Sequence, residues 1–101
     1  MNQIDFTKRS SVYEAAIENF GTTAQMVVAL EELSECQKEI CKILRGKGNL
    51  ENLAEEVADA TIMLEQLRQM FPINEQVCRK MDEKIARLVY RLNTMESEGD
   101  L

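Results

Sequence analysis

Apolar residues recur along the chain with the three- and four-residue spacing of an α-helix, and this period divides the sequence into four segments. The four glycines and the single proline lie between these segments or after the last of them. The pattern predicts an all-α, four-helix-bundle-like protein. A short first helix is expected to precede three longer antiparallel helices.

Residues that favour helix starts and stops set the expected bounds. The first helix is expected at about residues 12–20, and the second is expected to start after Thr22 or Thr23 and to reach about Arg45. The third and fourth are expected at about residues 50–70 and 75–95. The expected N-caps are Ser10 or Ser11 for the first helix, Asn49 for the third and Asn74 for the fourth. The expected stops are Gly21, the glycines of residues 45–49 and Pro72. Residues 96–101 are expected to form a frayed tail.

The second predicted helix carries an apolar and a polar stripe on roughly opposite faces. The apolar stripe, expected to face the core, consists of Met26, Leu30, Leu33, Ile40 and Leu44. The polar stripe consists of Gln25, Glu32, Glu35 and Glu39. The expected core stripe of the third helix is Leu53, Val57, Ala60, Leu64 and Leu67, with Glu56, Asp59 and Met63 at its edge. Carboxylates at such an edge lose hydration and need a compensating cation.

Composition narrows the class of protein. The chain has 101 residues, of which 45% are hydrophobic and 30% charged, and this size suits a single domain over residues 1–101. It has no apolar run long enough for a membrane span and no apolar segment typical of a secretory signal near its start, so a cytoplasmic protein is expected. Cys36, Cys41 and Cys78 have no disulfide or zinc spacing and are expected to be reduced thiols in or near the core.

Charge and the missing histidine restrict the chemistry. A formal charge of −6 argues against general binding of nucleic acid. With no His in the sequence, Ser-His-Asp and Cys-His nucleophile systems are excluded. Any catalysis must use carboxylates, a metal, lysine or arginine.

Acidic pairs lie on two successive helices that a short turn makes antiparallel. They are Glu32 with Glu35, and Glu56 with Asp59, and both lie well away from the turn, so that they can face each other. Four oxygen-bearing side chains without His or Cys favour a hard cation, Mg²⁺ or Mn²⁺. The alternative is a solvated acidic face, since the chain has fourteen glutamates.

The fourth helix carries four basic residues at spacings that place them on one side of it, beside an apolar stripe. They are Lys80, Lys84, Arg87 and Arg91. Beside a divalent-cation site such residues can hold the outer phosphates of a triphosphate. Alternatively they are a solvated face, on which Glu83 pairs with Arg87.

The acidic and basic motifs together resemble one protein family. Glu-Glu-x-x-Glu at residues 31–35 is followed, after 20 residues, by Glu-x-x-Asp at residues 56–59. With Gln25 upstream, "IMLEQL" after Asp59 and "KIAR" at residues 84–87, the region from about Gly21 to Leu92 is similar to the MazG-type all-α nucleoside triphosphate pyrophosphohydrolases.

The resemblance implies hydrolysis of a nucleoside triphosphate, chiefly a dNTP, between its α and β phosphates. It implies that Glu32, Glu35, Glu56 and Asp59 bind Mg²⁺, with Mn²⁺ as a substitute. Glu31 or one of the ligands, such as Glu35, would accept the proton of the attacking water. Lys84 and Arg87, or alternatively Lys80 and Arg91, would hold the phosphates, and Gln25 the base or sugar.

The family's tendency to form dimers or tetramers predicts a homo-oligomer, for which Val28, Ile62 and Tyr90 are candidate contact residues. Two other classes stay open. One is a non-enzymatic helical interaction protein or an inactive family member. The other is a metal-independent all-α enzyme of the chorismate-mutase type.

Overall fold

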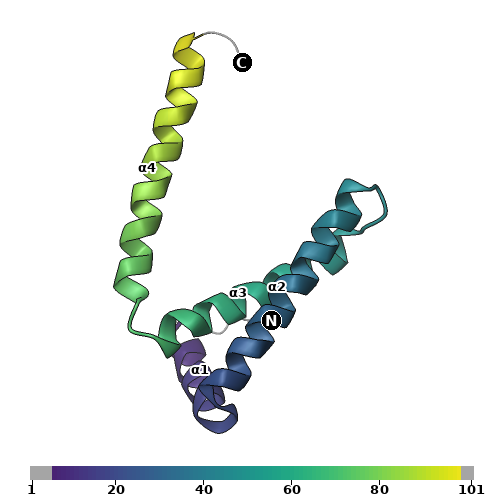
Figure 1. Ribbon diagram of the computed structural model, residues 1–101, viewed down its shortest axis with the longest axis vertical. Helices are drawn as coiled ribbons and strands as arrows, with labels where there is room; N and C mark the ends of the chain where they lie inside the picture. The colour runs from purple at the N-terminus through teal and green to yellow at the C-terminus, as the bar shows by residue number, and fades with distance from the viewer. Residues whose placement is uncertain (1–5, 99–101) are drawn as a thin grey trace. The chain divides into compact units, whose positions relative to one another are not determined.

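A computed structural model describes residues 6–98 of the chain, and residues 1–5 and 99–101 lie outside the described part. Between residues 6 and 98 it has four α-helices and no strand (Figure 1). They are α1 (Phe6–Phe20), α2 (Thr22–Leu44), α3 (Leu50–Met70) and α4 (Asn74–Glu98). The predicted all-α class with four helices is confirmed.

The chain divides into two compact units, residues 1–71 with α1–α3 and residues 72–101 with α4, and each is described by itself. The extent of a single domain over residues 1–101 stays a prediction. Among the helices of the described residues, none has the length and apolarity needed to cross a lipid bilayer.

Helix α1 begins six residues before its predicted start. Ser10 and Ser11 therefore lie within the helix, and their predicted role as N-caps is wrong. Ser10 instead makes tertiary contacts, which a local pattern does not record. Ser10 Oγ donates to Gln69 Oε1 of α3 at 3.1 Å, and the Ser10 carbonyl accepts from Gln69 Nε2 at 2.8 Å.

Glycine and asparagine shape the connections of the first unit as predicted. Gly21, between α1 and α2, has a φ of 95°, and Gly46, after α2, has a φ of 74°, both in a region that favours glycine. The side chain of Asn49 accepts a hydrogen bond from the Asn52 N–H at 2.8 Å, which confirms it as the N-cap of α3. The turn is short, so α2 and α3 pack side by side and antiparallel (Figure 1).

The end of α3 also agrees with the sequence, because Phe71, directly before Pro72, is extended at φ −119° and ψ 148°. The start of α4 differs by one residue. Asn74 is its first residue, and the Ile73 carbonyl accepts from the Val77 N–H at 2.8 Å, so Ile73 and not Asn74 occupies the cap position. The helix continues to Glu98, so residues 96–98 of the predicted tail are helical, whereas residues 99–101 lie outside the described part.

The predicted core face of α2 is wrong. Leu30 is 68% exposed and Leu44 is 81% exposed, and Met26 and Ile40 are also exposed. The residues of α2 that are buried are Gln25, Ala29 and Glu39, on the stripe predicted to be polar. Helix α2 therefore packs with its polar stripe against α3 and leaves most of its apolar stripe exposed.

The expected core stripe of α3 is partly correct. Ala60 is buried, and Leu53 and Leu67 are half-buried, but Val57 and Leu64 are exposed. Cys36, Cys41 and Cys78 form no disulfide with one another, in agreement with the predicted reduced thiols. Only Cys36 is near the core, because Cys41 and Cys78 are exposed, so their predicted burial is wrong.

Helix α1 completes the first unit by packing on both α2 and α3. Tyr13, which is buried, donates its hydroxyl to Glu65 of α3, and Arg9 lies 3.4 Å from the same carboxylate. Burial, followed by the hydrogen bond and charge of Glu65, raises the pKa of Tyr13. These contacts hold the end of α3 that lies farthest from the turn.

Candidate metal centre

The seam between α2 and α3 is fixed by a buried pair of amides. Gln25 Nε2 donates to Gln66 Oε1 at 2.8 Å, and both side chains are buried. Glu32 lies seven residues after Gln25, and Asp59 lies seven residues before Gln66. Because seven residues are close to two helical turns, this register places Glu32 and Asp59 opposite each other on the same seam.

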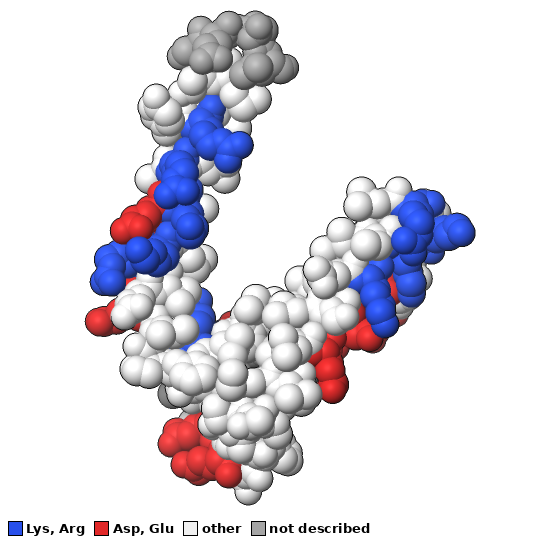
Figure 2. Space-filling view, in the orientation of Figure 1, with Lys and Arg blue, Asp and Glu red and all other residues white. Residues whose placement is uncertain are grey.

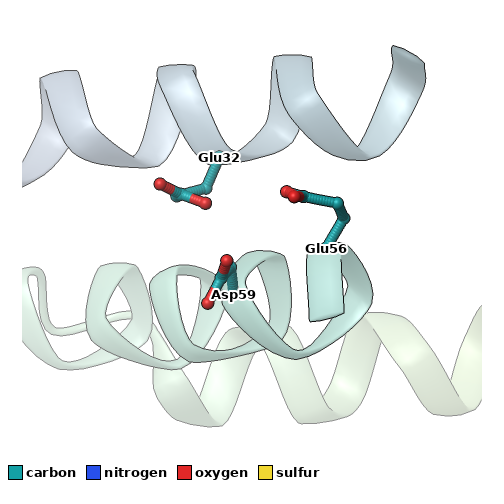
Figure 3. A group of neighbouring side chains, drawn as sticks. All are labelled: Glu32, Glu56 and Asp59. Atoms are coloured by element: carbon teal, nitrogen blue, oxygen red, sulfur yellow. The ribbon is translucent and has the colours of Figure 1, made fainter. Parts of the chain in front are cut away.

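Three carboxylates meet at that point. One oxygen from each of Glu32, Glu56 and Asp59 lies within 4.8 Å of the others. Glu32 comes from α2 and the other two from α3, and all three side chains project into the space between the helices (Figure 3). Glu32 and Glu56 are half-buried and Asp59 is exposed, so the cluster can be reached from solvent. The predicted convergence of the acidic motifs is therefore present for three of the four residues.

The electrostatics of the cluster are unfavourable when no cation is bound. Loss of hydration raises the pKa of Glu32, and the charge and hydrogen bond of Asp59 and the charge of Glu56 raise it further. Loss of hydration also raises the pKa of Glu56, followed by the charges of Asp59, Glu35 and Glu39. Both carboxyl groups lie where burial and like charges oppose their ionised form, and a divalent cation would reverse this effect.

Two carboxylate oxygens in the seam lack a hydrogen-bond donor. They are Glu56 Oε2 and Glu39 Oε1, and both are buried. Glu39 is only 7% exposed, and its other oxygen accepts from Lys42 Nζ at 3.1 Å. A buried carboxylate oxygen without a hydrogen-bond partner is destabilising, and a cation beside it would offset this cost. Glu39 was not among the predicted site residues. Its position on the polar stripe, seven residues after Glu32, nevertheless indicates that it faces the same seam.

The other predicted site residues of α2 do not belong to the group of three converging carboxylates. Glu35 lies 3.3 Å from Lys38 Nζ and is not one of the three converging carboxylates, yet its charge contributes to the raised pKa of Glu56. Glu31 is exposed, and its charge contributes least to the raised pKa of Glu32. Gln25 is buried, and its amide donates to Gln66, so contact with a substrate would require this pair to separate. The roles of Glu31, Glu35 and Gln25 stay predictions.

The basic residues form a stripe along α4, drawn in blue in Figure 2. All four, Lys80, Lys84, Arg87 and Arg91, are exposed. Glu83 lies 3.8 Å from Lys80 Nζ, so Lys80 is an ion-pair partner of Glu83 within α4. The four residues give this unit a cationic side, and their contact with phosphate stays a prediction.

The donor set of the cluster fits a hard divalent cation. All three converging groups are carboxylates, and Mg²⁺ and Mn²⁺ prefer oxygen ligands. One or two carboxylates with several waters are the usual protein ligands of Mg²⁺ where a phosphate completes its shell.

Comparison of the chain with protein-family models, with curated proteins and with solved structures found no match.

The raised pKa values predict how the stability of the metal-free protein depends on pH. In the unfolded chain Glu32 and Glu56 have the ordinary glutamate pKa of 4.5. In the folded state the carboxyl groups of Glu32 and Glu56 stay protonated to a higher pH than in the unfolded chain. The free energy of unfolding therefore falls as pH rises from 4.5 through the folded-state pKa values. Below pH 4.5 the contribution is fully present. Without metal, the melting temperature of the wild type should therefore fall relative to that of the Glu32→Gln/Glu56→Gln variant as pH rises toward 7. Parallel curves would contradict this expectation.

Proposed function

We propose that this chain is a Mg²⁺-dependent nucleoside triphosphate pyrophosphohydrolase that acts mainly on dNTPs. The observation that carries the proposal is the convergence of Glu32, Glu56 and Asp59 in the α2–α3 seam, together with a buried Glu56 oxygen that has no donor. The resemblance of the two acidic motifs to the MazG-type family supports the same reaction. The products would be a nucleoside monophosphate and pyrophosphate, with one water consumed.

The proposed roles of the acidic residues follow from their placement in the α2–α3 seam, and those of the basic residues from the family resemblance. Glu32, Glu56 and Asp59 would hold Mg²⁺, with Glu35 as a fourth ligand after it leaves Lys38. When bound, Mg²⁺ would polarise the phosphorus and lower the pKa of an attacking water. Glu31, which is exposed beside the cluster, is the candidate acceptor for the proton of that water. Lys84 and Arg87 are the candidate contacts to the leaving pyrophosphate.

A second candidate function has one observation in its favour. The exposed apolar stripe of α2 is typical of a helix that contacts another protein. We propose that a second copy of the chain covers it, in a dimer or tetramer, which sedimentation equilibrium would test. A helical interaction protein without activity would expose the same stripe but has no need of converging carboxylates.

The proposed reaction is tested by its products. With Mg²⁺ and a panel of dNTPs and NTPs, we expect release of pyrophosphate and a monophosphate, and no release when EDTA removes the metal. Pyrophosphate and orthophosphate should be measured separately, because orthophosphate with a diphosphate would mean cleavage at the γ phosphate. No hydrolysis of any nucleotide would favour the interaction protein.

A further inference from the structure

Helix α4 carries the repeat that is typical of one strand of a coiled coil. Apolar residues follow one another at spacings of three and four residues from Cys78 to Met95. In the heptad notation a to g, the a residues are Cys78, Ile85 and Leu92, and the d residues are Met81, Leu88 and Met95. No charged residue interrupts this α4 seam, which is the stripe that two helices of a coiled coil bury against each other.

The α4 seam is exposed in the structure. Cys78 is exposed, and the five other seam residues are each between 45% and 57% exposed. Among the described residues of its compact unit, 72–101, α4 is the one helix. Because a helix in water gains most of its stability by packing its apolar face, a helix with this seam is expected to pack on another helix.

The two sides of the α4 seam carry charges of opposite sign. Lys84 and Arg91, in the basic stripe of Figure 2, occupy g positions on one side. Glu75 and Asp82 occupy e positions on the other side, and all four residues are exposed. In a parallel pair of identical helices the g side of each helix faces the e side of the other, so opposite charges meet at both edges. An antiparallel pair would instead place Lys84 beside Arg91 of the second copy, where like charges repel.

We propose that α4 is a dimerisation element that forms a parallel, in-register, two-stranded coiled coil with α4 of a second copy of the chain. The central heptad supports two strands, because Ile85 at a with Leu88 at d is the combination that favours parallel dimers. The apolar stripe of α2 fits α4 less well, since the residues along its solvent side, Val27, Ser34 and Cys41, carry no charge that could match the charged sides of α4.

This contact goes beyond the proposed function and does not rest on it. It uses no residue of the α2–α3 seam and needs no metal or nucleotide. It is also separate from the contact proposed for the α2 stripe, and the two contacts together would give a tetramer.

Sedimentation equilibrium of the full-length chain tests the α4 seam. Leu88→Glu places a charge at the centre of the seam and should halve the molar mass, whether the wild type is a dimer or a tetramer. Tyr90→Glu is the matched control, because it adds the same charge at an f position of the same helix, on the side away from the seam, where Tyr90 is 70% exposed. It should keep the mass of the wild type. A monomeric wild type, or a mass that Leu88→Glu leaves unchanged, would overturn the proposal.

Cys78 tests the direction of the two helices without any substitution. In a parallel, in-register pair the two Cys78 residues face each other at an a position, close enough for a disulfide. In an antiparallel pair each Cys78 would face Met95 of the second copy, about 25 Å along the helix from the other Cys78. Oxidation by oxygen with copper phenanthroline should therefore give a covalent dimer whose bond maps to Cys78, and Cys78→Ser should not form it. Cys41, which is exposed on α2, is the internal control for random collision. Absence of the Cys78 bond, or an equal yield at Cys41, would reject the parallel pair.

Charge exchange tests the two edges of the seam. Lys84→Glu/Arg91→Glu makes both sides acidic, and Glu75→Lys/Asp82→Lys makes both sides basic, so each variant should associate with itself on the order of tenfold more weakly at low salt. Mixed in equal amounts, the two variants should associate as tightly as the wild type. Unchanged self-association of both variants would overturn the charge pairing, and circular dichroism of each variant shows whether it folds. None of these measurements uses nucleotide, so absence of pyrophosphate release would reject the proposed function and leave the coiled coil standing.

Discussion

Glu56→Gln is expected to abolish nucleotide hydrolysis while leaving the metal-free protein as stable as the wild type or more stable. The substitution removes a negative charge that loss of hydration, Asp59, Glu35 and Glu39 all disfavour. It also supplies an amide that can donate to neighbouring carboxylates, and its shape is nearly unchanged. Removal of residues that merely support metal ligands lowers activity by 10- to 100-fold, so loss of a ligand should lower it by at least about 100-fold.

In thermal melts, Mg²⁺ should raise the melting temperature of the wild type much more than that of Glu56→Gln. At 100 times its dissociation constant, a cation that binds only the folded state stabilises it by about 2.7 kcal/mol, which in a chain of this size is a rise of about 10 °C or more in melting temperature. The wild type should show this rise, and Glu56→Gln only a small part of it.

The matched control is Glu55→Gln, which removes the same charge from the adjacent, exposed residue. It should retain both activity and the Mg²⁺ response. An equal Mg²⁺ shift in wild type and Glu56→Gln would reject the metal centre, and retained activity in Glu56→Gln would reject its role in the reaction.

The sequence predicts the helices well, because local signals determine them. The N-cap at Asn49, the positive φ of Gly21 and Gly46, and the extended residue before Pro72 all follow from the chemistry of one or a few residues. The start of α1 could not be predicted in this way. Ser10, the predicted N-cap, instead contacts Gln69, which lies 59 residues away in the sequence.

The packing of α2 was mispredicted for a related reason. Periodicity finds an apolar stripe but does not say which surface covers it, and the stripe containing Leu30 and Leu44 is exposed. The acidic face packs against α3 because small apolar residues, such as Ala29 and Ala60, are interspersed with the acids on the seam and are themselves buried. Motif spacing nevertheless identified three converging carboxylates correctly, since antiparallel helices joined by a short turn leave little choice of register.

The buried amide pair between Gln25 and Gln66 should be the most sensitive polar contact of the seam. Replacement of either residue by methionine, which keeps the volume, leaves the other amide buried without its partner. An unsatisfied buried amide costs about 1–3 kcal/mol, so each single variant should melt at least about 4 °C below the wild type. The Gln25→Met/Gln66→Met variant removes both polar groups and should recover most of that loss, because two apolar side chains of suitable volume can replace a buried hydrogen bond with little change in stability.

Urea denaturation of the four proteins without metal measures this coupling as a double-mutant cycle. Additive losses in the double variant would mean that the two amides do not depend on each other. Steady-state kinetics of the double variant then separates the structural role of Gln25 from its predicted contact with substrate. If the pair acts only to fix the register, the recovered fold should restore both kcat and KM. A KM that stays raised when stability has returned would instead place the Gln25 amide against the nucleotide, which requires the pair to open when substrate binds.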